Sequence, residues 1–281
     1  MLTETVTSAR NDKVKRVLQL QEKARARREC GRFVVEGRRE LGHCLAAGFQ
    51  AETLFVCEEI LPPDDCSTLC RLAAEGNPEL RVIRVPAALY ARIAYREGTE
   101  GILAEIRLRE RSLDEVRLGA APLVVVLEGV EKPGNLGAVL RSADAAGADA
   151  VICCDPATDW FNPNLIRASL GGVFTTQVAA ASTPDTLSWL RRQGLRILTA
   201  QLQDASWYYD TPMTGGTALI LGTESTGLTS AWRRAADARI KIPMLGRLDS
   251  LNVSVSAAIL LFEAVRQRQG GAFPPIPSDH A

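Results

Sequence analysis

The sequence predicts an α/β fold whose larger, C-terminal part is an open parallel sheet. Apolar runs recur along this part and alternate with stretches of helical periodicity. The first run, residues 123–127, contains no polar side chain, as a parallel strand covered on both faces requires. We expect six strands, at 123–127, 150–154, 175–178, 196–200, 217–221 and 238–242, and helices near 136–146, 163–170, 185–193, 230–236 and 252–268.

A smaller α/β domain is predicted before this sheet. Its expected strands are 33–36, 53–57, 81–85 and 101–106, and its expected helices are 11–28, 37–47, 67–75 and 87–95. A charged stretch at 107–117, followed by Gly119-Ala-Ala-Pro122, separates the two parts. We therefore expect domains at 1–110 and 122–269, a linker at 111–121, and a disordered tail at 270–281, where three prolines accompany no periodicity.

Composition describes an ordinary globular chain. With 281 residues, 46% hydrophobic and 23% charged, it is long enough for two domains. No apolar run approaches the ~18 residues of a membrane span, and the N-terminus lacks the apolar core of a secretory signal, so a cytoplasmic location is expected. Seven irregularly spaced cysteines without a Cys-x-x-Cys pair favour free thiols over disulfides or a metal site.

Positive charge is concentrated at the N-terminus of a chain whose net charge is zero. Residues 1–40 hold eleven lysines and arginines against six carboxylates. Such a block is either a solvated helix face or the footprint of a polyanion such as nucleic acid. The residues taken as candidates for RNA contact are Arg10, Lys13, Arg25, Arg27 and Arg28.

Three segments rich in small polar residues directly follow predicted strands. They are Asn135-Leu-Gly-Ala-Val-Leu-Arg141, Leu221-Gly-Thr-Glu-Ser-Thr-Gly-Leu228 and Ile242-Pro-Met-Leu-Gly-Arg-Leu-Asp-Ser-Leu-Asn-Val-Ser-Val-Ser256. Ligands gather at the carboxyl ends of parallel strands, so one sheet edge could bring the three together. The polar residues of the last segment stand where a helix must begin. They are therefore either caps of that helix or ligand contacts.

A dinucleotide is one ligand to consider for this edge. Gly134-Asn-Leu-Gly137 links a strand to a helix, and Asp155 ends the next strand about 20 residues later, as in a nucleotide-binding βαβ unit. The glycine pattern is incomplete, because Gly-x-Gly-x-x-Gly is absent. An NAD-dependent oxidoreductase is therefore the weaker alternative.

Taken together and in order, the three segments resemble the signature motifs of the SpoU (TrmH) family of SPOUT RNA ribose methyltransferases. The resemblance covers residues 120–268. In addition, Ser8-Ala-Arg-Asn-Asp-Lys-Val-Lys15 and Phe33-Val-Val-Glu-Gly37 resemble the small RNA-binding domain of longer family members. The resemblance implies methylation of a ribose 2′-hydroxyl, with ribosomal RNA of the large subunit as the preferred substrate and tRNA as the alternative. A catalytically silent RNA-binding protein is the other alternative.

The resemblance also implies a fold, a cofactor and an assembly. The family ties its C-terminal helix into a deep trefoil knot, binds S-adenosyl-L-methionine there, and forms homodimers. From the cysteine pattern, no metal is expected. By motif position, the residues expected to hold the cofactor are Thr199, Ala200, Gly222, Ile242 and Leu251.

Catalytic roles follow from the same motifs, namely for Asn135, Arg141, Glu224, Asn252 and Ser254. An arginine with a pKa above ~12 is a poor base, so Arg141 is expected to clamp a phosphate and stabilise the developing alkoxide. Asn135 would fix Arg141 or the ribose. Arg167 lies in a segment that resembles one facing the substrate in the family, and a structural capping role is the alternative. The aromatic residues Trp160, Phe161, Trp207, Tyr208 and Tyr209 either stack on bases or pack between helices.

Overall fold

The computed structural model describes residues 2–95, 98–156, 159–223 and 226–270. The chain divides into two compact units, and each is described by itself. The N-terminal unit comprises Met1–Arg111, Glu131–Arg141 and Ala157–Thr175, and the C-terminal unit comprises Ser112–Val130, Ser142–Pro156 and Thr176–Ala281. The predicted tail, residues 271–281, lies outside the described residues.

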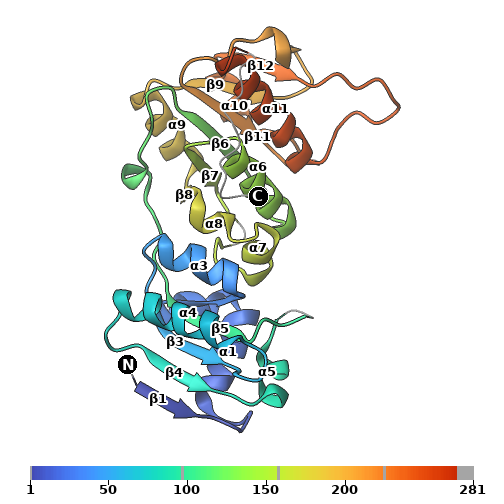
Figure 1. Ribbon diagram of the computed structural model, residues 1–281. Coiled ribbons are helices and arrows are strands. Elements are labelled where there is room, and N and C mark those ends of the chain that lie inside the picture. Colours follow the sequence, from blue (N-terminus) through green and yellow to red (C-terminus); the bar gives the residue numbers. More distant parts are fainter. Residues whose placement is uncertain (1, 96–97, 157–158, 224–225, 271–281) are drawn as a thin grey trace. The chain divides into compact units, whose positions relative to one another are not determined.

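A five-stranded mixed sheet forms the centre of the N-terminal unit (Figure 1). Its order is β1-β4-β3-β5-β2, with β5 antiparallel to both β3 and β2. The strands are β1 (Leu2–Thr5), β2 (Arg32–Glu36), β3 (Ala51–Val56), β4 (Arg81–Arg84) and β5 (Ile102–Arg107). The helices are α1 (Asp12–Glu22), α2 (Ala24–Cys30), α3 (Arg38–Ala46), α4 (Pro63–Gly76), α5 (Ala87–Ile93), most of α6 (Pro133–Ala145), α7 (Pro163–Ala168) and α8 (Gly172–Thr175).

Two features of this unit differ from the prediction. The helix expected at 11–28 is broken at Lys23, whose extended backbone (φ −118°, ψ 114°) ends α1 and begins α2. The strand β1 was not predicted, because all four of its residues are exposed and show no apolar alternation. It pairs with β4 alone, which makes it an edge strand.

An aromatic cluster packs α7 and α8 onto the small sheet within the N-terminal unit. The rings of Phe33 on β2 and Phe161 stack with centroids 4.3 Å apart. Phe49 meets Phe161 and Phe174 edge-on at 5.9 and 5.4 Å. Both Trp160 and Phe161 are buried, so packing and not base stacking explains these two aromatic residues.

Seven parallel strands form the sheet of the C-terminal unit, in the order β10-β12-β9-β11-β6-β7-β8 (Figure 1). The open parallel sheet predicted from the sequence is therefore confirmed. Its strands are β6 (Leu123–Glu128), β7 (Ala150–Cys154), β8 (Gln177–Ala181), β9 (Arg196–Ala200), β10 (Ser206–Trp207), β11 (Thr217–Leu221) and β12 (Ala238–Lys241). The helices are α9 (Thr183–Arg192), α10 (Ser230–Ala235) and α11 (Val253–Arg268), with 3-10 turns η1 (Leu113–Glu115) and η2 (Tyr208–Asp210).

The core of this unit lies between one face of the sheet and the helices α9 and α10. Alternate residues of β6, such as Val124 and Val126, point to this face and are fully buried. Trp189 on α9 and Trp232 on α10 complete the cluster and are also buried. Burial of such large apolar side chains supplies the main driving force for folding.

The stretch predicted as a linker packs against this unit. Val116 is buried in its core cluster. The Arg117 N–H donates to the side chain of Gln177 at 2.9 Å, and the Gly119 N–H donates to Asp149 at 2.7 Å. No helix in the described part of the chain has both the length and the apolar character needed to cross a membrane.

Arg268 fastens the last turn of α11. Its guanidinium donates to the backbone carbonyls of Ala121 (2.6 Å), Pro122 (3.0 Å), Met213 (3.0 Å) and Gly215 (2.8 Å). Burial lowers the pKa of Arg268. These bonds tie the end of the helix to the chain segments that precede β6 and β11.

Candidate functional site

Two adjoining cavities open beyond the carboxyl ends of β9, β11 and β12. Their volumes are about 130 and 290 Å³. The walls common to both are Ala200, Gln201, Leu202, Asp249, Ser250, Leu251 and Ser256. This is the position at which parallel α/β sheets bind their ligands.

Four of the five residues predicted to hold the cofactor line these cavities. Ala200 and Leu251 line both, Ile242 lines the smaller one, and Gly222 lines the larger one. Thr199 is different, because it is fully buried in β9 and is not among the described lining residues. Its hydroxyl lies 3.3 Å from the side-chain oxygen of Gln201, which does line both cavities.

Gly222 allows the loop after β11 to turn back on itself. A Cβ atom at this position would lie 2.4 Å from the carbonyl carbon and oxygen of Gly227, and 2.8 Å from the amide nitrogen of Leu228. No side chain fits in this space without moving the backbone. The sequence motif therefore needs glycine here for packing as well as for access to the cavity. Glu224, predicted as catalytic, lies outside the described residues.

The segment before α11 provides both a cap and cavity walls. Asn252 is the N-cap residue, and its side-chain oxygen accepts hydrogen bonds from the Ser254 backbone N–H (2.9 Å) and hydroxyl (2.6 Å). Ser250 and Ser256 line the cavities instead. Asn252 is therefore a cap of α11, while contact of Ser250 and Ser256 with a ligand stays a prediction. The catalytic roles of Asn252 and Ser254 stay predictions.

Asn135 and Arg141 lie on α6, within the N-terminal unit. They are six positions apart, so the two side chains do not share a helix face, unlike residues three or four apart. Between them, Gly137 marks the close approach of α6 to α7. A Cβ atom there would lie 2.5 Å from the Cβ of Ala168 and 2.8 Å from the backbone of Ser169. The catalytic roles of Asn135 and Arg141 stay predictions.

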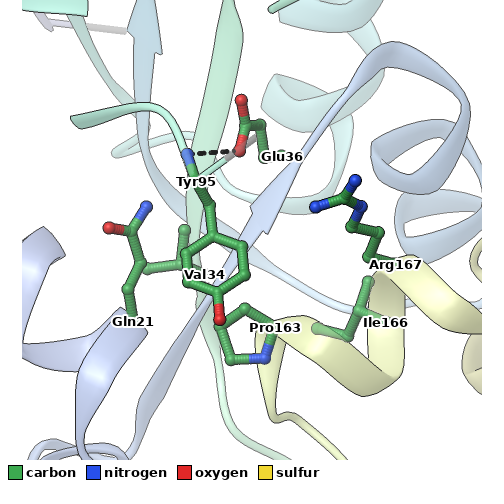
Figure 2. A pocket seen from close by; sticks show the side chains of 7 residues that line it. All are labelled: Gln21, Val34, Glu36, Tyr95, Pro163, Ile166 and Arg167. Carbon is green, nitrogen blue, oxygen red and sulfur yellow. Dashed lines mark hydrogen bonds between the residues drawn. The ribbon is translucent and has the colours of Figure 1, made fainter. Parts of the chain in front are cut away.

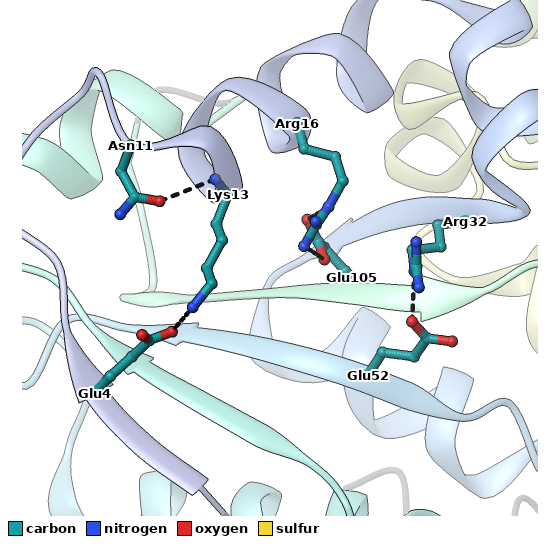
Figure 3. Close-up of polar contacts among 7 residues, drawn as sticks. All are labelled: Glu4, Asn11, Lys13, Arg16, Arg32, Glu52 and Glu105. Carbon is teal, nitrogen blue, oxygen red and sulfur yellow. Dashed lines mark hydrogen bonds and ion pairs between the residues drawn. The ribbon is translucent and has the colours of Figure 1, made fainter.

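Much of the predicted basic cluster is paired with carboxylates (Figure 3). Lys13 pairs with Glu4, and Arg16 makes a two-bond contact with the buried carboxylate of Glu105 at 2.9 and 2.7 Å. Arg25, an exposed residue, pairs with Glu29 four residues along α2. Pairs at an exposed surface contribute ~0–1 kcal/mol, so Lys13 and Arg25 can exchange partners easily, whereas Arg16 is held by a buried carboxylate.

The prediction that Arg27 contacts RNA is wrong. Its side chain is 2% exposed, and the guanidinium donates to Asp159 at 3.1 and 2.8 Å and to the Leu20 carbonyl at 2.6 Å. A cation held in this way has a structural role and cannot reach RNA. By contrast, Arg10 and Arg28 are exposed, and among the described residues no ion pair is found for either.

Arg167 borders a small pocket in the N-terminal unit, and its guanidinium extends from α7 toward this space (Figure 2). The Tyr95 backbone N–H donates to Glu36 at 2.8 Å inside it. The pocket is lined by Gln21, Val34, Glu36, Tyr95, Pro163, Ile166 and Arg167. Its volume of about 20 Å³ suits roughly one water molecule, so the pocket is too small for a nucleotide. Arg167 is exposed, and a contact with RNA would be made at the protein surface.

Glu128, in the C-terminal unit, is a residue near the cavities that the sequence analysis missed. It ends β6 and is buried, and its carboxylate binds Thr229 at the start of α10. The signal was a single carboxylate closing an otherwise apolar strand. All seven cysteines are free thiols, and within the described residues no group of three His, Cys, Asp or Glu is placed to hold a metal ion.

Comparison with known proteins assigns both parts of the chain. Residues 122–262 match the SpoU rRNA Methylase family, and residues 11–104 match the MRM3-like substrate binding domain. The chain is 29% identical to the 23S rRNA (guanosine(2553)-2'-O)-methyltransferase RlmP of Bacillus subtilis, over 92% of this chain and 97% of that protein. It is 37% identical to the 23S rRNA (guanosine-2'-O-)-methyltransferase RlmB of Pseudomonas putida, over 72% of this chain and 83% of that protein.

Solved structures show the same fold along almost the whole chain. A crystal structure of an RNA 2'-O ribose methyltransferase is 38% identical, with a TM-score of 0.80 and coverage of 94% of this chain and 99% of that chain. An AdoMet-bound rRNA methyltransferase from Sinorhizobium meliloti is 29% identical, with a TM-score of 0.86 and coverage of 94% and 98%. These matches agree with the parallel sheet, the preceding α/β domain and the motifs described above, and the chain belongs to the SpoU rRNA methylase family.

Proposed function

We propose that this protein transfers a methyl group from S-adenosyl-L-methionine to a ribose 2′-hydroxyl of large-subunit ribosomal RNA. The observation that carries the proposal is the pair of cavities beyond β9, β11 and β12, lined by Ala200, Gly222, Ile242 and Leu251 in a member of the SpoU family. Relatives along nearly the full chain are named as 23S rRNA 2'-O-methyltransferases. We place the reaction in the cytoplasm, where ribosomes are assembled.

The residues present suit this methyl donor. Ala200, Ile242 and Leu251 offer apolar surface to an adenine ring, while Gln201, Asp249 and Ser250 offer polar groups to a ribose and an amino acid moiety. S-adenosylmethionine supplies an electrophilic methyl group on a positively charged sulfonium. The Asp249 carboxylate is suited to the positive charge of such a ligand, and Lys241 and Arg233, which line the smaller and the larger cavity, are suited to its carboxylate.

For the reaction itself we assign roles to the motif residues. In-line attack by the 2′-hydroxyl requires alignment of the ribose with the methyl group, and positioning alone can supply several kcal/mol. Arg141 would hold the target phosphate and stabilise the developing alkoxide. Because Asn135 does not share a helix face with Arg141, we assign it to the ribose. Glu224, Asn252 and Ser254 complete the proposed set.

RNA capture is proposed for the N-terminal domain, residues 1–110, with the methyl transfer carried out by residues 122–269. The surface cations of this domain available for the task are Arg10 and Arg28, together with Lys13 and Arg25 once their ion pairs exchange. Arg167, in the part assigned to methyl transfer, is a further exposed cation. Such contacts to phosphates bind RNA with little sequence preference and position it for the reaction.

We further propose that α11 closes a trefoil knot and that two copies of the chain form a homodimer. Several large apolar side chains on α11 and in the segment before it are exposed, namely Leu245 (98%), Leu248 (76%), Val255 (46%) and Phe262 (47%). Val255 and Phe262 are seven residues apart on α11 and so share one face. Exposed apolar groups of this size favour burial against another surface.

A methyl-transfer assay tests the proposed function. Purified protein is incubated with tritiated S-adenosylmethionine and ribosomal RNA or tRNA, and the labelled nucleosides are identified. We expect label on ribose in large-subunit RNA. Label on a base would refute the reaction class, and label in tRNA alone would refute the substrate. Tight RNA binding without label would indicate a silent RNA-binding protein.

The role of Arg141 is tested separately. The substitution Arg141→Ala should abolish transfer but leave the affinity for S-adenosylmethionine nearly unchanged in calorimetry. Full activity of this variant would remove Arg141 from the mechanism. The same calorimeter addresses the dinucleotide alternative, because NAD binding in place of S-adenosylmethionine binding would reverse the cofactor assignment.

A further inference from the structure

An aromatic surface lies at the edge of the large sheet, and it shares Lys241 with the smaller of the two cavities described above. Trp207 ends the edge strand β10 and is 40% exposed, and Tyr209 in the following turn is 45% exposed. The other three of the four tryptophans, at positions 160, 189 and 232, are at most 7% exposed. Trp207 is therefore the one exposed tryptophan, and it lies beside a second exposed aromatic ring.

The rings are held in a defined arrangement. The centroids of Trp207 and Tyr209 are 6.4 Å apart with planes at 18°, and Tyr208 meets Tyr209 edge-on at 5.2 Å. Strand pairing sets Trp207 opposite Lys241 on β12. The hydroxyl of Thr211 donates to the Trp207 carbonyl at 3.3 Å. Because the backbone is fixed on both sides, little entropy would be lost when a flat ligand stacks here.

Positive charge accompanies the rings. The ammonium group of Lys241 lies 4.6 Å from the centre of the Trp207 ring, within the range of a cation–π contact. An open hollow of about 470 Å³ adjoins them, lined by Arg196, Trp207, Asp210 and Lys241 among others. Arg196 is oriented by the Pro212 carbonyl, to which it donates at 2.8 Å. Two cations against one carboxylate give the hollow a net positive charge.

We propose that this surface binds a single-stranded nucleotide of the RNA substrate, with the base stacked on Tyr209 and Trp207 and the phosphate near Lys241 and Arg196. Aromatic faces beside cations are the combination that proteins use for unpaired nucleic acid, and stacking accepts any base. The net positive charge favours RNA over a second copy of the chain. The inference rests on the proposed function, because it takes RNA as the substrate.

Tryptophan fluorescence gives a direct test in the full-length protein. Since Trp207 is the exposed tryptophan, a stacked base should quench emission from this residue. We expect a short single-stranded oligouridylate to quench the wild-type protein. The same strand in a duplex with oligoadenylate should quench much less. Quenching should disappear in Trp207→Phe, which removes the fluorophore but keeps a ring for stacking.

Affinity measurements at fixed salt concentration complete the test. The double variant Trp207→Ala with Tyr209→Ala should bind the oligouridylate at least about tenfold more weakly, as the loss of one or two stacked bases implies. Trp207→Phe with Tyr209→Phe should retain most of the affinity. Leu72→Ala is the matched control, because Leu72 is an apolar residue of α4 that is 37% exposed. It should behave as the wild type.

Each outcome separates this inference from the proposed function. Unchanged affinity of the double alanine variant, or no quenching of the wild type, would overturn the inference even if methyl transfer proceeds. A change of sedimentation coefficient in that variant, with RNA affinity unchanged, would make the surface a subunit contact and also overturn it. Quenching and weakened binding as predicted, without any methyl transfer by the wild type, would support the inference and refute the proposed function.

Discussion

Glu128 and Thr229 join the end of β6 to the start of α10 through two hydrogen bonds. One carboxylate oxygen of Glu128 accepts from the Thr229 backbone N–H at 2.8 Å, and the other accepts from the Thr229 hydroxyl at 2.7 Å. Residues 222–223 and 226–228, which line the larger cavity, come directly before this point in the chain. The pair therefore fixes one end of the loop and supports the cofactor site without touching it.

The first prediction concerns this pair. Glu128→Gln replaces one acceptor oxygen by an NH2 group, which cannot accept from Thr229. Loss of a buried hydrogen bond to a charged group costs ~1–3 kcal/mol. We expect lower thermal stability and several-fold weaker binding of S-adenosylmethionine in calorimetry. Glu131→Gln, at an exposed carboxylate, is the control. Wild-type affinity and stability in Glu128→Gln would show that the loop is fixed by other contacts.

A second prediction separates the two roles of Asn252. Asp is as good an N-cap as Asn but lacks the amide donors, whereas Ala removes the cap and costs ~1 kcal/mol. We expect Asn252→Asp to unfold at the wild-type temperature yet lose methyl transfer. Asn252→Ala should unfold at a lower temperature and also lose methyl transfer. Thermal denaturation and the transfer assay measure the two effects. Full activity of Asn252→Asp would leave Asn252 as a cap only.

The third prediction distinguishes exposed arginines from the buried one. RNA affinity should depend less steeply on salt after Arg10→Gln or Arg28→Gln, with the slope reduced by about one per phosphate contact. Arg27→Met should instead destabilise the fold by ~3–5 kcal/mol, because Asp159 loses its partner. Filter binding over a salt series and denaturant unfolding provide the data. An unchanged slope in both Gln variants would show that these arginines do not contact RNA phosphates.

Thiol reactivity gives a fourth prediction. Burial raises the pKa of Cys153 and of Cys154 to about 12, while Cys30 is exposed. Native protein at pH 8 should therefore react with iodoacetamide at Cys30 and not at these two positions, as peptide mass spectrometry would show. The raised pKa values also mean that their contribution to stability is complete below pH ~9 and is lost as the pH rises toward 12. Equal labelling of all three thiols would contradict the burial.

The sequence predicted the parallel sheet well because local patterns carry that information. Uninterrupted apolar runs such as β6 allow few other structures. The strands that were missed carry no such pattern. The residues of β1 are all exposed, and β10 has only two residues. Their place in the sheets depends on pairing with β4 and β12, which a local pattern cannot reveal.

For the site, too, local sequence patterns gave correct predictions, and long-range contacts caused the error. The rule that ligands bind at the carboxyl ends of strands, together with the motifs, placed Ala200, Gly222, Ile242 and Leu251 around the cavities. The error on Arg27 has a long-range cause, because its partner Asp159 lies 132 residues away in the sequence. A basic run looks the same whether its members face solvent or a distant carboxylate.

The most direct test of the central claim is a count of 2′-O-methylated nucleotides in large-subunit ribosomal RNA. RNA from cells that lack this protein is compared with RNA from cells that express either the wild type or Arg141→Ala. We predict that one ribose methylation is missing without the protein, returns with the wild type and does not return with Arg141→Ala. An identical set of ribose methylations in ribosomal RNA from all three strains would contradict the account.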